Sequence, residues 1–323
     1  MTVWNTWRAR LVNLTNPAAR LAQWAKDVPE DLKRPQAPVT ATSIAARDIV
    51  DWDYWTSHYR SSHHEVKGWA QGSDQRYRST QVAIPALEQW VHTEKVPWIG
   101  DIQAVQAMTA SKSPLESYAT MEEFAQARCP DWIQNPSASQ VDALMNWHEI
   151  RPKDGLSMAA WDGRLVLNNS GGSHHFAAAR EQARLLGQEV PLLTDLTIRR
   201  LNPEAVQLLL GAYDVIAIPK GAQHSNRFFD SMEKMGATFY TLPMPFPHQN
   251  LQAILFPKTE IASRLAANTL RQAGFWDVGV TCQELAAGQH RHARAHDGYN
   301  PAPAPSPIPA HAPAAARPRP SLS

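Results

Sequence analysis

Cysteine is nearly absent from this sequence of 323 residues, and its scarcity argues against a disulfide-stabilised fold and against a zinc site built from cysteines. The two cysteines, Cys129 and Cys282, are far apart, and neither belongs to a Cys-x-x-Cys motif. A disulfide framework and a cysteine-based zinc site are therefore not expected. This cysteine usage is typical of a reducing compartment, and we expect the protein to be cytoplasmic.

Long apolar runs and a strong charge of one sign are also missing. No run of about 18 apolar residues occurs, so we expect no membrane span, and the first residues lack the apolar core and cleavage site of a signal peptide. The formal net charge is +1, which argues against electrostatic coating of nucleic acid as the main task. A local basic patch is compatible with this charge. A nucleic-acid partner therefore stays open without being indicated, and so does a protein partner.

The composition divides the chain into three parts. Residues 1–45 are predicted to hold an N-terminal helix and a proline-containing linker, and residues 46–290 an α+β domain. Residues 291–323 are predicted to be a disordered tail rich in proline and alanine. The stretch 301–323 alone holds eight of the 25 prolines, and it has too few large apolar side chains to form a core.

Hydrophobic spacing and the positions of glycine and proline predict the elements of the middle part. Helices are expected at about 84–95, 114–128, 139–150, 174–186, 203–210, 222–236 and 259–273. A β-hairpin is expected at 158–167, with further strands at 190–193, 214–219, 237–245 and 251–257. This order predicts an α+β fold with a small mixed sheet and a largely helical N-terminal elaboration.

Residues 161–193 have the features of an anion site. A strand is expected to end near Leu167, and the loop Asn168 to Gly172 then leads into a helix that begins at Ser173 or His174. The first turn of a helix carries unpaired N–H groups and a partial positive charge, and glycines allow an anion to approach the backbone. These features predict a phosphate site. The alternative is a plain glycine turn with Ser173 as the helix cap.

The segment GGSHHFAAAREQARLLGQEVPL resembles the signature of the ParB/sulfiredoxin superfamily, and the likeness covers about residues 158–195. It implies a ParB/sulfiredoxin-like core around residues 145–220 that binds ATP or CTP with Mg²⁺. The implied nucleotide-binding residues are Asn169, Gly171, Gly172, Ser173, His174 and His175. Ser173 stands where sulfiredoxins have a cysteine, so reduction of sulfinic acids is not expected. His175 stands where they have an arginine, which removes a bidentate phosphate contact.

Two residues are candidates for acid–base chemistry. His175 could act as an acid or a base, and Glu149, just upstream of the hairpin, could be a general base or a magnesium ligand. The neighbouring Asp154 could take the same role as Glu149. For each carboxylate a structural role is the simpler interpretation.

The leading functional hypothesis is therefore a nucleotide-phosphate-binding protein, with hydrolysis or phosphoryl transfer left open. One alternative is a metal-dependent nuclease, although the near-neutral charge counts against it. Another is a non-catalytic interaction protein that keeps the fold. Whether the chain is an enzyme is not decided, and no metal ligands are assigned.

Other clusters of polar side chains have simpler structural interpretations. The histidines and the glutamate of residues 58–65 match no standard zinc spacing. Arg76 and Arg78 could supply the missing cation near a phosphate, but exposed basic residues are common. Adventitious metal binding is the simplest interpretation of three histidines close together near the tail, His290, His292 and His296.

Overall fold

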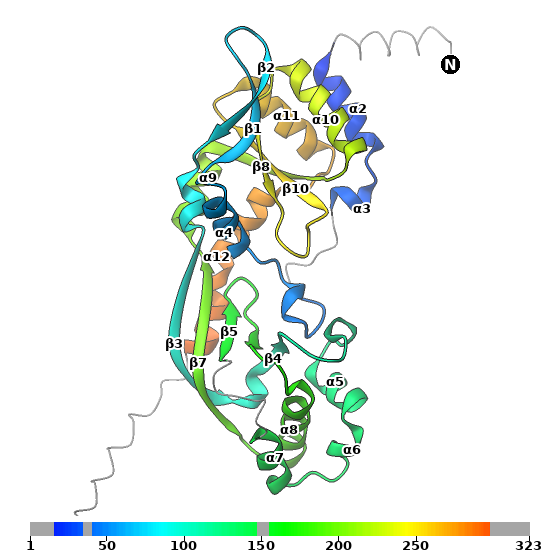
Figure 1. The fold of residues 1–323 in the computed structure, drawn as a ribbon, viewed down its shortest axis with the longest axis vertical. Helices are drawn as coiled ribbons and strands as arrows, with labels where there is room; N and C mark the ends of the chain where they lie inside the picture. The colour runs from blue at the N-terminus through cyan, green and yellow to red at the C-terminus, as the bar shows by residue number, and fades with distance from the viewer. Residues whose placement is uncertain (1–15, 35–40, 147–154, 298–323) are drawn as a thin grey trace, which may run out of the picture.

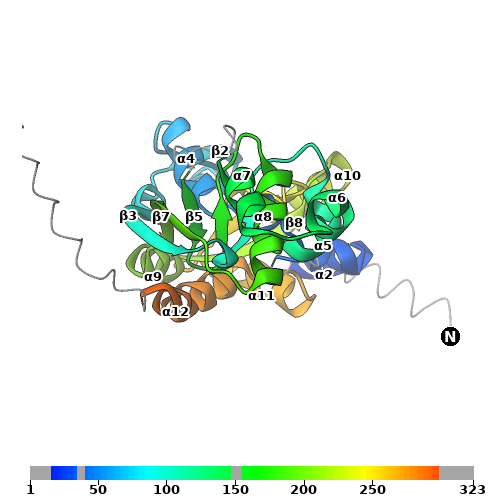
Figure 2. The same ribbon diagram turned by 90° about the horizontal axis from the view of Figure 1, so that it is seen from below.

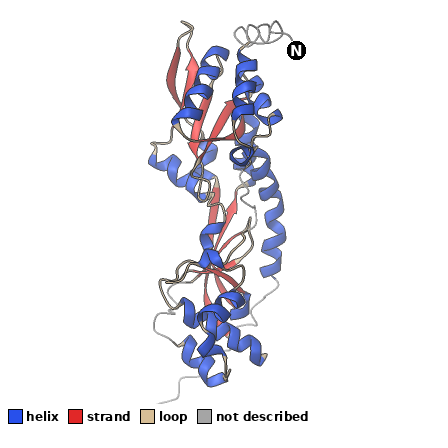
Figure 3. Ribbon diagram, turned by 90° about the vertical axis from the view of Figure 1, so that its right-hand side faces the viewer, coloured by secondary structure: helices blue, strands red, loops and turns tan. Residues whose placement is uncertain are grey.

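The computed structural model of the protein describes residues 16–34, 41–146 and 155–297. Within these ranges the fold is α+β, as the sequence predicts, with 11 α-helices and two five-stranded sheets. The molecule is elongated, with one sheet in each half (Figure 1). Figure 3 shows helices beside both sheets.

The lower sheet is the predicted mixed sheet, with the strand order β3-β7-β5-β6-β4. The pairs β4–β6 and β5–β7 are parallel, whereas β3–β7 and β5–β6 are antiparallel. Its strands are β3 (Val91–Asp101), β4 (Val105–Met108), β5 (Leu156–Ala159), β6 (Leu165–Leu167) and β7 (Pro191–Leu201). The helices of this half are α5 (Met121–Arg128), α6 (Pro130–Ile133), α7 (Ala138–Met145) and α8 (Ser173–Leu186). Seen from below, α8 lies among the other three (Figure 2).

The upper sheet is antiparallel throughout, with the strand order β2-β1-β9-β10-β8. Its strands are β1 (Val66–Gln71), β2 (Tyr77–Val82), β8 (Tyr213–Pro219), β9 (Phe239–Pro243) and β10 (Leu251–Pro257). The helices of this half are α2 (Pro17–Asp27), α3 (Glu30–Lys33), α4 (Asp53–Ser61), α9 (Pro203–Ala212), α10 (Ala222–Met235), α11 (Ile261–Gln272) and α12 (Val278–Asp297).

Strand β8 of the upper sheet is buried on both faces, because its side chains alternate between two cores that helices cover. On β8, Ile216 and Ile218 belong to a core shared with α2, α10 and α11. The alternate residues Val215 and Ala217 belong to a second core shared with α4, α9 and α12. The near-continuous apolar run of this strand therefore reflects burial on two sides.

The two halves are joined by a long ladder and one helix. All eleven residues of β3 pair with β7, from Val91 opposite Leu201 to Asp101 opposite Pro191. Helix α12, orange in Figure 1, contacts both β7 and β8. Its buried Gln289 accepts a hydrogen bond from the Leu201 N–H at 3.0 Å and donates one to the Leu201 carbonyl at 2.7 Å. This side chain therefore completes the backbone hydrogen bonding at the end of β7.

Most of the elements predicted after residue 150 are present. The hairpin 158–167 is the β5–β6 pair, although its turn is wider than the predicted two residues. Gly187 and Gly236 end α8 and α10 in the left-handed conformation, with φ of 62° at both. Their lack of a Cβ atom suits them to this position.

The helix predicted at 84–95 is wrong. A short 3-10 turn covers Pro85–Gln89, and the chain then enters β3 at Val91. Valine and threonine favour strands, and pairing with β7 satisfies the backbone groups of this segment. Strands β1 to β4 were not predicted, because their side chains are mixed in polarity.

The predicted N-terminal helix and C-terminal tail can be compared with the structure only in part. Helix α12 extends to Asp297, whereas the tail was predicted to begin at residue 291. The remaining tail, 298–323, and the first part of the predicted N-terminal helix, 1–15, lie outside the described residues. Among the described helices, none is long and apolar enough to cross a bilayer.

We predict that Gly68→Ala destabilises the protein. Gly68 lies on β1 opposite Tyr240, and an added Cβ atom would overlap the Phe239 carbonyl oxygen of the neighbouring strand β9. Displacing a backbone group should lower the free energy of unfolding by about 1–3 kcal/mol in urea denaturation. The control is Gly211→Ala on α9, where no atom lies within 4 Å of the new Cβ. It should raise stability by about 0.5–1 kcal/mol, and equal losses in both variants would contradict the prediction.

We predict a second effect, on the acid stability of the protein. His248 is buried beside Trp276, its Nε2 has no partner among the described residues, and burial lowers its pKa to about 4. The unfolded chain takes up this proton near pH 6.5, so the free energy of unfolding should fall as the pH decreases from about 6.5 to about 4. His248→Phe should lose less stability over this range, by about 3 kcal/mol. Urea denaturation of the parent and the variant at pH 7 and pH 4.5 measures this loss of unfolding free energy. An equal loss in both proteins would refute the prediction.

Candidate functional site

The candidate site lies at the carboxyl edge of two parallel strands. Because β4 and β6 run in the same direction, the loops that follow them leave the sheet at the same edge. These loops are residues 109–113 and 168–172. The Thr109 N–H donates to the Leu167 carbonyl at 3.1 Å, which extends the strand pairing into the loops.

Helix α8 begins directly after the second loop. Gly172 occupies the N-cap position with φ of 68° and provides no side-chain hydrogen bond to the first turn. Ser173 is the first helical residue, so the alternative that it caps the helix is wrong. The positive end of the dipole of this 14-residue helix lies at Ser173, next to the loop of residues 109–113.

Serine side chains of the first loop meet the first turn of α8. The Ser173 hydroxyl donates to the Ser111 hydroxyl at 2.9 Å. The Nδ1 atom of His174 lies 3.3 Å from Ser173 Oγ, and its Nε2 atom lies 3.1 Å from Ser113 Oγ. Four side chains from two distant parts of the sequence thus form one hydrogen-bonded chain.

Asn169 fixes the two loops relative to each other. Its amide oxygen accepts from the N–H groups of Thr109 and Ala110, both at 3.2 Å. Its amide nitrogen donates to the carbonyl oxygens of Ala110 at 2.8 Å and Gly171 at 2.9 Å. The side chain is buried and fully occupied within the protein. This positioning role was not predicted, and direct contact of Asn169 with a nucleotide stays a prediction.

The surroundings of His174 are electropositive. Burial is the main cause that lowers the pKa of His174, and the charges of Arg128, His175 and Lys112 lower it further. Lys112 lies in the first loop, between the two serines, and Arg128 is the last residue of α5. The imidazole of His174 is therefore neutral at neutral pH, and the neighbouring cations supply the positive charge of the site.

Aromatic rings and one thiol form the walls beside the two histidines. The ring of Phe124 lies 5.2 Å from that of His174, and the ring of Trp132 lies 4.6 Å from that of His175. The Cys129 thiol donates to the His174 carbonyl at 3.4 Å. Burial raises the pKa of this thiol to about 11, so it stays protonated and is no nucleophile.

The structure brings together only some of the residues that the sequence proposed. Gly171 to His175 lie in one turn, whereas Glu149 and Asp154 lie outside the described residues. Arg76 and Arg78 interact with Asp74 in the β1–β2 hairpin of the upper half, and α8 is in the lower half (Figure 1). The idea that they complete the phosphate site is therefore wrong.

The histidine-rich segment 58–65 also belongs to the upper half. His63 and His64 follow α4 with positive φ values of 58° and 63°, and His64 Nδ1 lies 3.7 Å from a carboxylate oxygen of Glu88. Within the described residues, no group of three or more histidine, cysteine, aspartate or glutamate side chains is placed to hold a metal ion.

Sequence reasoning missed Ser111, Lys112, Ser113 and Arg128. The only sequence signal of the first three is a small polar loop, Ala-Ser-Lys-Ser-Pro, and such loops are common, whereas Arg128 is an ordinary basic residue at the end of α5. Because the strand before it was not predicted, nothing indicated that this loop reaches the GGSHH turn.

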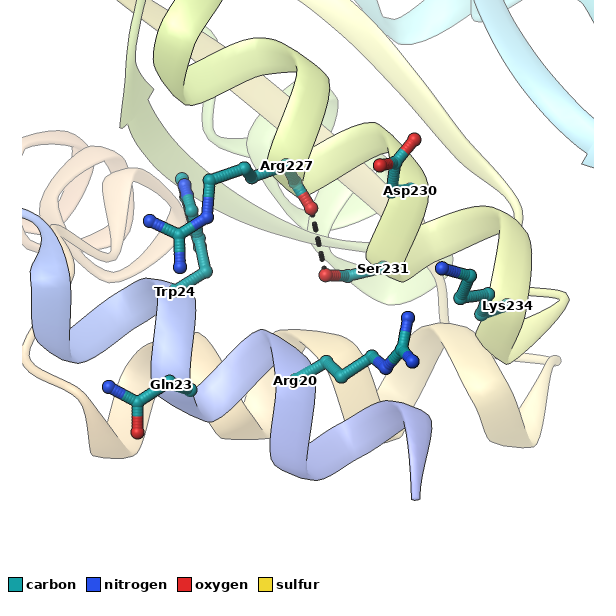
Figure 4. A pocket seen from close by; sticks show the side chains of 7 residues that line it. All are labelled: Arg20, Gln23, Trp24, Arg227, Asp230, Ser231 and Lys234. Atoms are coloured by element: carbon teal, nitrogen blue, oxygen red, sulfur yellow. Dashed lines mark hydrogen bonds between the residues drawn. The ribbon is translucent and has the colours of Figure 1, made fainter. Parts of the chain in front are cut away.

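A separate groove of about 310 Å³ lies between α2 and α10 in the upper half. Figure 4 shows its lining side chains, from α2 Arg20, Gln23 and Trp24, and from α10 Arg227, Asp230, Ser231 and Lys234. Arg227 forms an ion pair with Asp27 at 2.7 Å, so part of the positive charge is already neutralised. The Ser231 hydroxyl donates to the Arg227 carbonyl of its own helix at 2.8 Å. These contacts therefore occupy two of the polar side chains that line the groove.

The comparison with protein families decides the classification. A family model described as a family of unknown function, DUF6685, matches residues 95–295. The chain belongs to the DUF6685 family. The suspected membership in the ParB/sulfiredoxin superfamily is wrong, because DUF6685 spans the segment 158–195 and no ParB or sulfiredoxin family matches. No curated protein and no solved structure matches this DUF6685 protein.

We predict that Asn169→Ala destabilises this DUF6685 protein by about 2 kcal/mol. The substitution leaves backbone groups of Ala110 and Gly171 without their partner in a partly buried place, and an unpaired buried group costs about 1–3 kcal/mol. Urea denaturation measures the change. The control Ser170→Ala alters an exposed neighbour and should stay within about 0.5 kcal/mol of the parent protein. If Asn169→Ala matches the control, the amide does not hold the loops.

Proposed function

We propose that this DUF6685 protein binds a phosphate-bearing anion, such as a nucleotide, at the N-terminus of α8. One observation carries the proposal. The loop after β4 places Lys112, together with two serine hydroxyls, against a helix start whose cap is a left-handed glycine. Arg128 adds a second cation from α5.

Three physical effects favour an anion at this place. The first turn of α8 offers backbone N–H groups and the positive end of the helix dipole. The two cations supply full charges, and together with His175 they lower the pKa of His174 electrostatically. Serine hydroxyls can turn to donate hydrogen bonds to phosphate oxygens. Together these groups form the kind of site at which phosphates bind to helix N-termini.

The roles within the site follow from the contacts. Gly171 and Gly172 allow the phosphate to approach the backbone, and Ser173 and His174 border it. His174 takes part as a neutral hydrogen-bonding group, because its pKa is lowered. Lys112 and Arg128 are both exposed, so both cations are open to a ligand from solution. Mg²⁺ would accompany a bound triphosphate and share its charge.

The proposal predicts a loss of affinity when the two cations are removed. Isothermal titration with ATP, CTP, ADP and pyrophosphate, each with and without Mg²⁺, identifies the ligand. The double variant Lys112→Ala/Arg128→Ala should weaken binding at least tenfold, since a hydrogen bond to a charged group contributes about 1.5–3 kcal/mol. Thermal unfolding without ligand checks that the variant is folded.

The matched control is Lys67→Ala, which removes an exposed cation from β1 in the upper half. This variant should bind with unchanged affinity. Absence of binding by every phosphate compound, or an equal loss in Lys67→Ala, would refute the proposal. In the first case the α8 turn has a structural role only.

A further inference from the structure

The hydrogen bonds around His174 define the protonation of its ring. The Ser173 hydroxyl donates its hydrogen to Ser111, so its oxygen is left to accept from Nδ1–H of His174. The Nε2 atom then carries a lone pair, and the Ser113 hydroxyl 3.1 Å away is its donor. The chain runs from Ser113 through the imidazole to Ser173 and ends at Ser111.

This arrangement matches a nucleophile, a base and an orienting group. Such a set requires a hydroxyl within about 2.6–3.2 Å of the base, and a third group that holds the base through its other nitrogen. Ser113 and His174 meet the first requirement, and Ser173 meets the second, as the third member of a serine triad does. We propose that Ser113, His174 and Ser173 form a catalytic centre that hydrolyses a carboxylic ester through an acyl-serine intermediate.

His174 has the properties that a general base needs. Its imidazole is neutral at neutral pH, because burial and then the charges of Arg128, His175 and Lys112 lower its pKa. The ring packs against Phe124, which limits its orientation. Ser113 is half-buried, so part of this residue is in contact with solvent. Ser173 is buried and has no such access, and its role is to position the base.

The reaction balances without any further reagent than water. Ser113 Oγ attacks the ester carbonyl carbon while His174 Nε2 takes its proton. The tetrahedral intermediate collapses, the C–O bond to the alcohol breaks, and the leaving alkoxide receives the proton from Nε2. Water, deprotonated by His174 Nε2, then attacks the acyl carbon of the acyl-serine. The bond between the acyl carbon and Ser113 Oγ breaks, Oγ takes the proton back from Nε2, and the carboxylic acid is released. We expect the positive end of the α8 dipole to stabilise the negative charge that develops on the carbonyl oxygen.

The same charges indicate the class of ester. The charges of Lys112 and Arg128, which act on His174, favour a substrate that carries a negative group. This part of the inference rests on the proposed anion binding. The covalent chemistry itself does not rest on it, because an uncharged ester can also acylate Ser113.

The first test uses the full-length protein and a fluorophosphonate, which reacts with activated serines. Mass spectrometry of the digested protein should locate the label on Ser113. Ser113→Ala and His174→Gln should abolish the labelling, while the control Ser117→Ala on an exposed neighbouring serine should keep it. No labelling of the folded protein, or labelling that survives in Ser113→Ala, would overturn the inference.

The second test measures turnover of p-nitrophenyl acetate. Ser113→Ala should reduce kcat/KM at least a hundredfold, and the parent rate should fall in acid with a midpoint below pH 6.5, where His174 becomes protonated. The basic groups that face the ring, Arg128, His175 and Lys112, all act to keep this midpoint low. Ser173→Ala should lower kcat more than it raises KM and should shift the midpoint. A pH profile identical in the parent and Ser173→Ala would contradict the positioning role.

A comparison of two esters separates catalysis from anion binding. The parent should prefer p-nitrophenyl hemisuccinate, which carries a carboxylate, over the neutral acetate. Lys112→Ala/Arg128→Ala should lose this preference. If the parent shows no preference but labels on Ser113, the anion binding fails and the catalytic centre stands. If phosphate compounds bind but no ester is hydrolysed, the catalytic centre fails alone.

Discussion

The buried amide of Asn169 is the contact on which the candidate site depends. It bonds to backbone groups on both loops that leave the carboxyl edge of the β4–β6 pair. Parallel pairing brings the two loops to one edge, and the amide fixes their spacing. Without it, the serines of residues 111–113 and the start of α8 would each be ordered by their own strand alone. The chain of hydroxyls through His174 is therefore a consequence of this spacing.

The lower sheet is in turn held by the ladder that reaches the upper half. β7 pairs with β3 along its whole length, and the hydrogen bonding at its end is completed by the side chain of Gln289. Because Gln289 lies on α12, which also covers the upper sheet, the packing of the two halves is coupled through one helix. The DUF6685 match at residues 95–295 includes most of β3, the other strands of the lower sheet and most of α12, and the candidate site lies within it.

Sequence patterns were reliable where local chemistry was strong. The apolar strands β8 and β10 and the glycine-ended helices α8 and α10 appear where periodicity and stop signals placed them. The patterns failed between residues 66 and 108. There β1, β2 and β3 contain many charged and polar residues. Many of the residues in these strands are exposed or only half-buried. For such strands, pairing with distant residues decides the structure, and a single sequence does not contain the pairing.

The sequence by itself determined that GGSHH is a glycine turn leading into a helix, because glycine conformation and helix periodicity are local properties. It also suggested the wrong superfamily, since the same local chemistry recurs in unrelated folds. Only the tertiary structure showed that Ser111, Lys112 and Ser113 face that turn, and that Arg128 lies near it. These residues are separated from His174 by about 45 to 63 positions, and the parallel strands and the Asn169 amide close that distance. The loop of residues 109–113 and the turn before α8 supply the side chains of the site. The parallel pairing of β4 with β6 brings these two segments together.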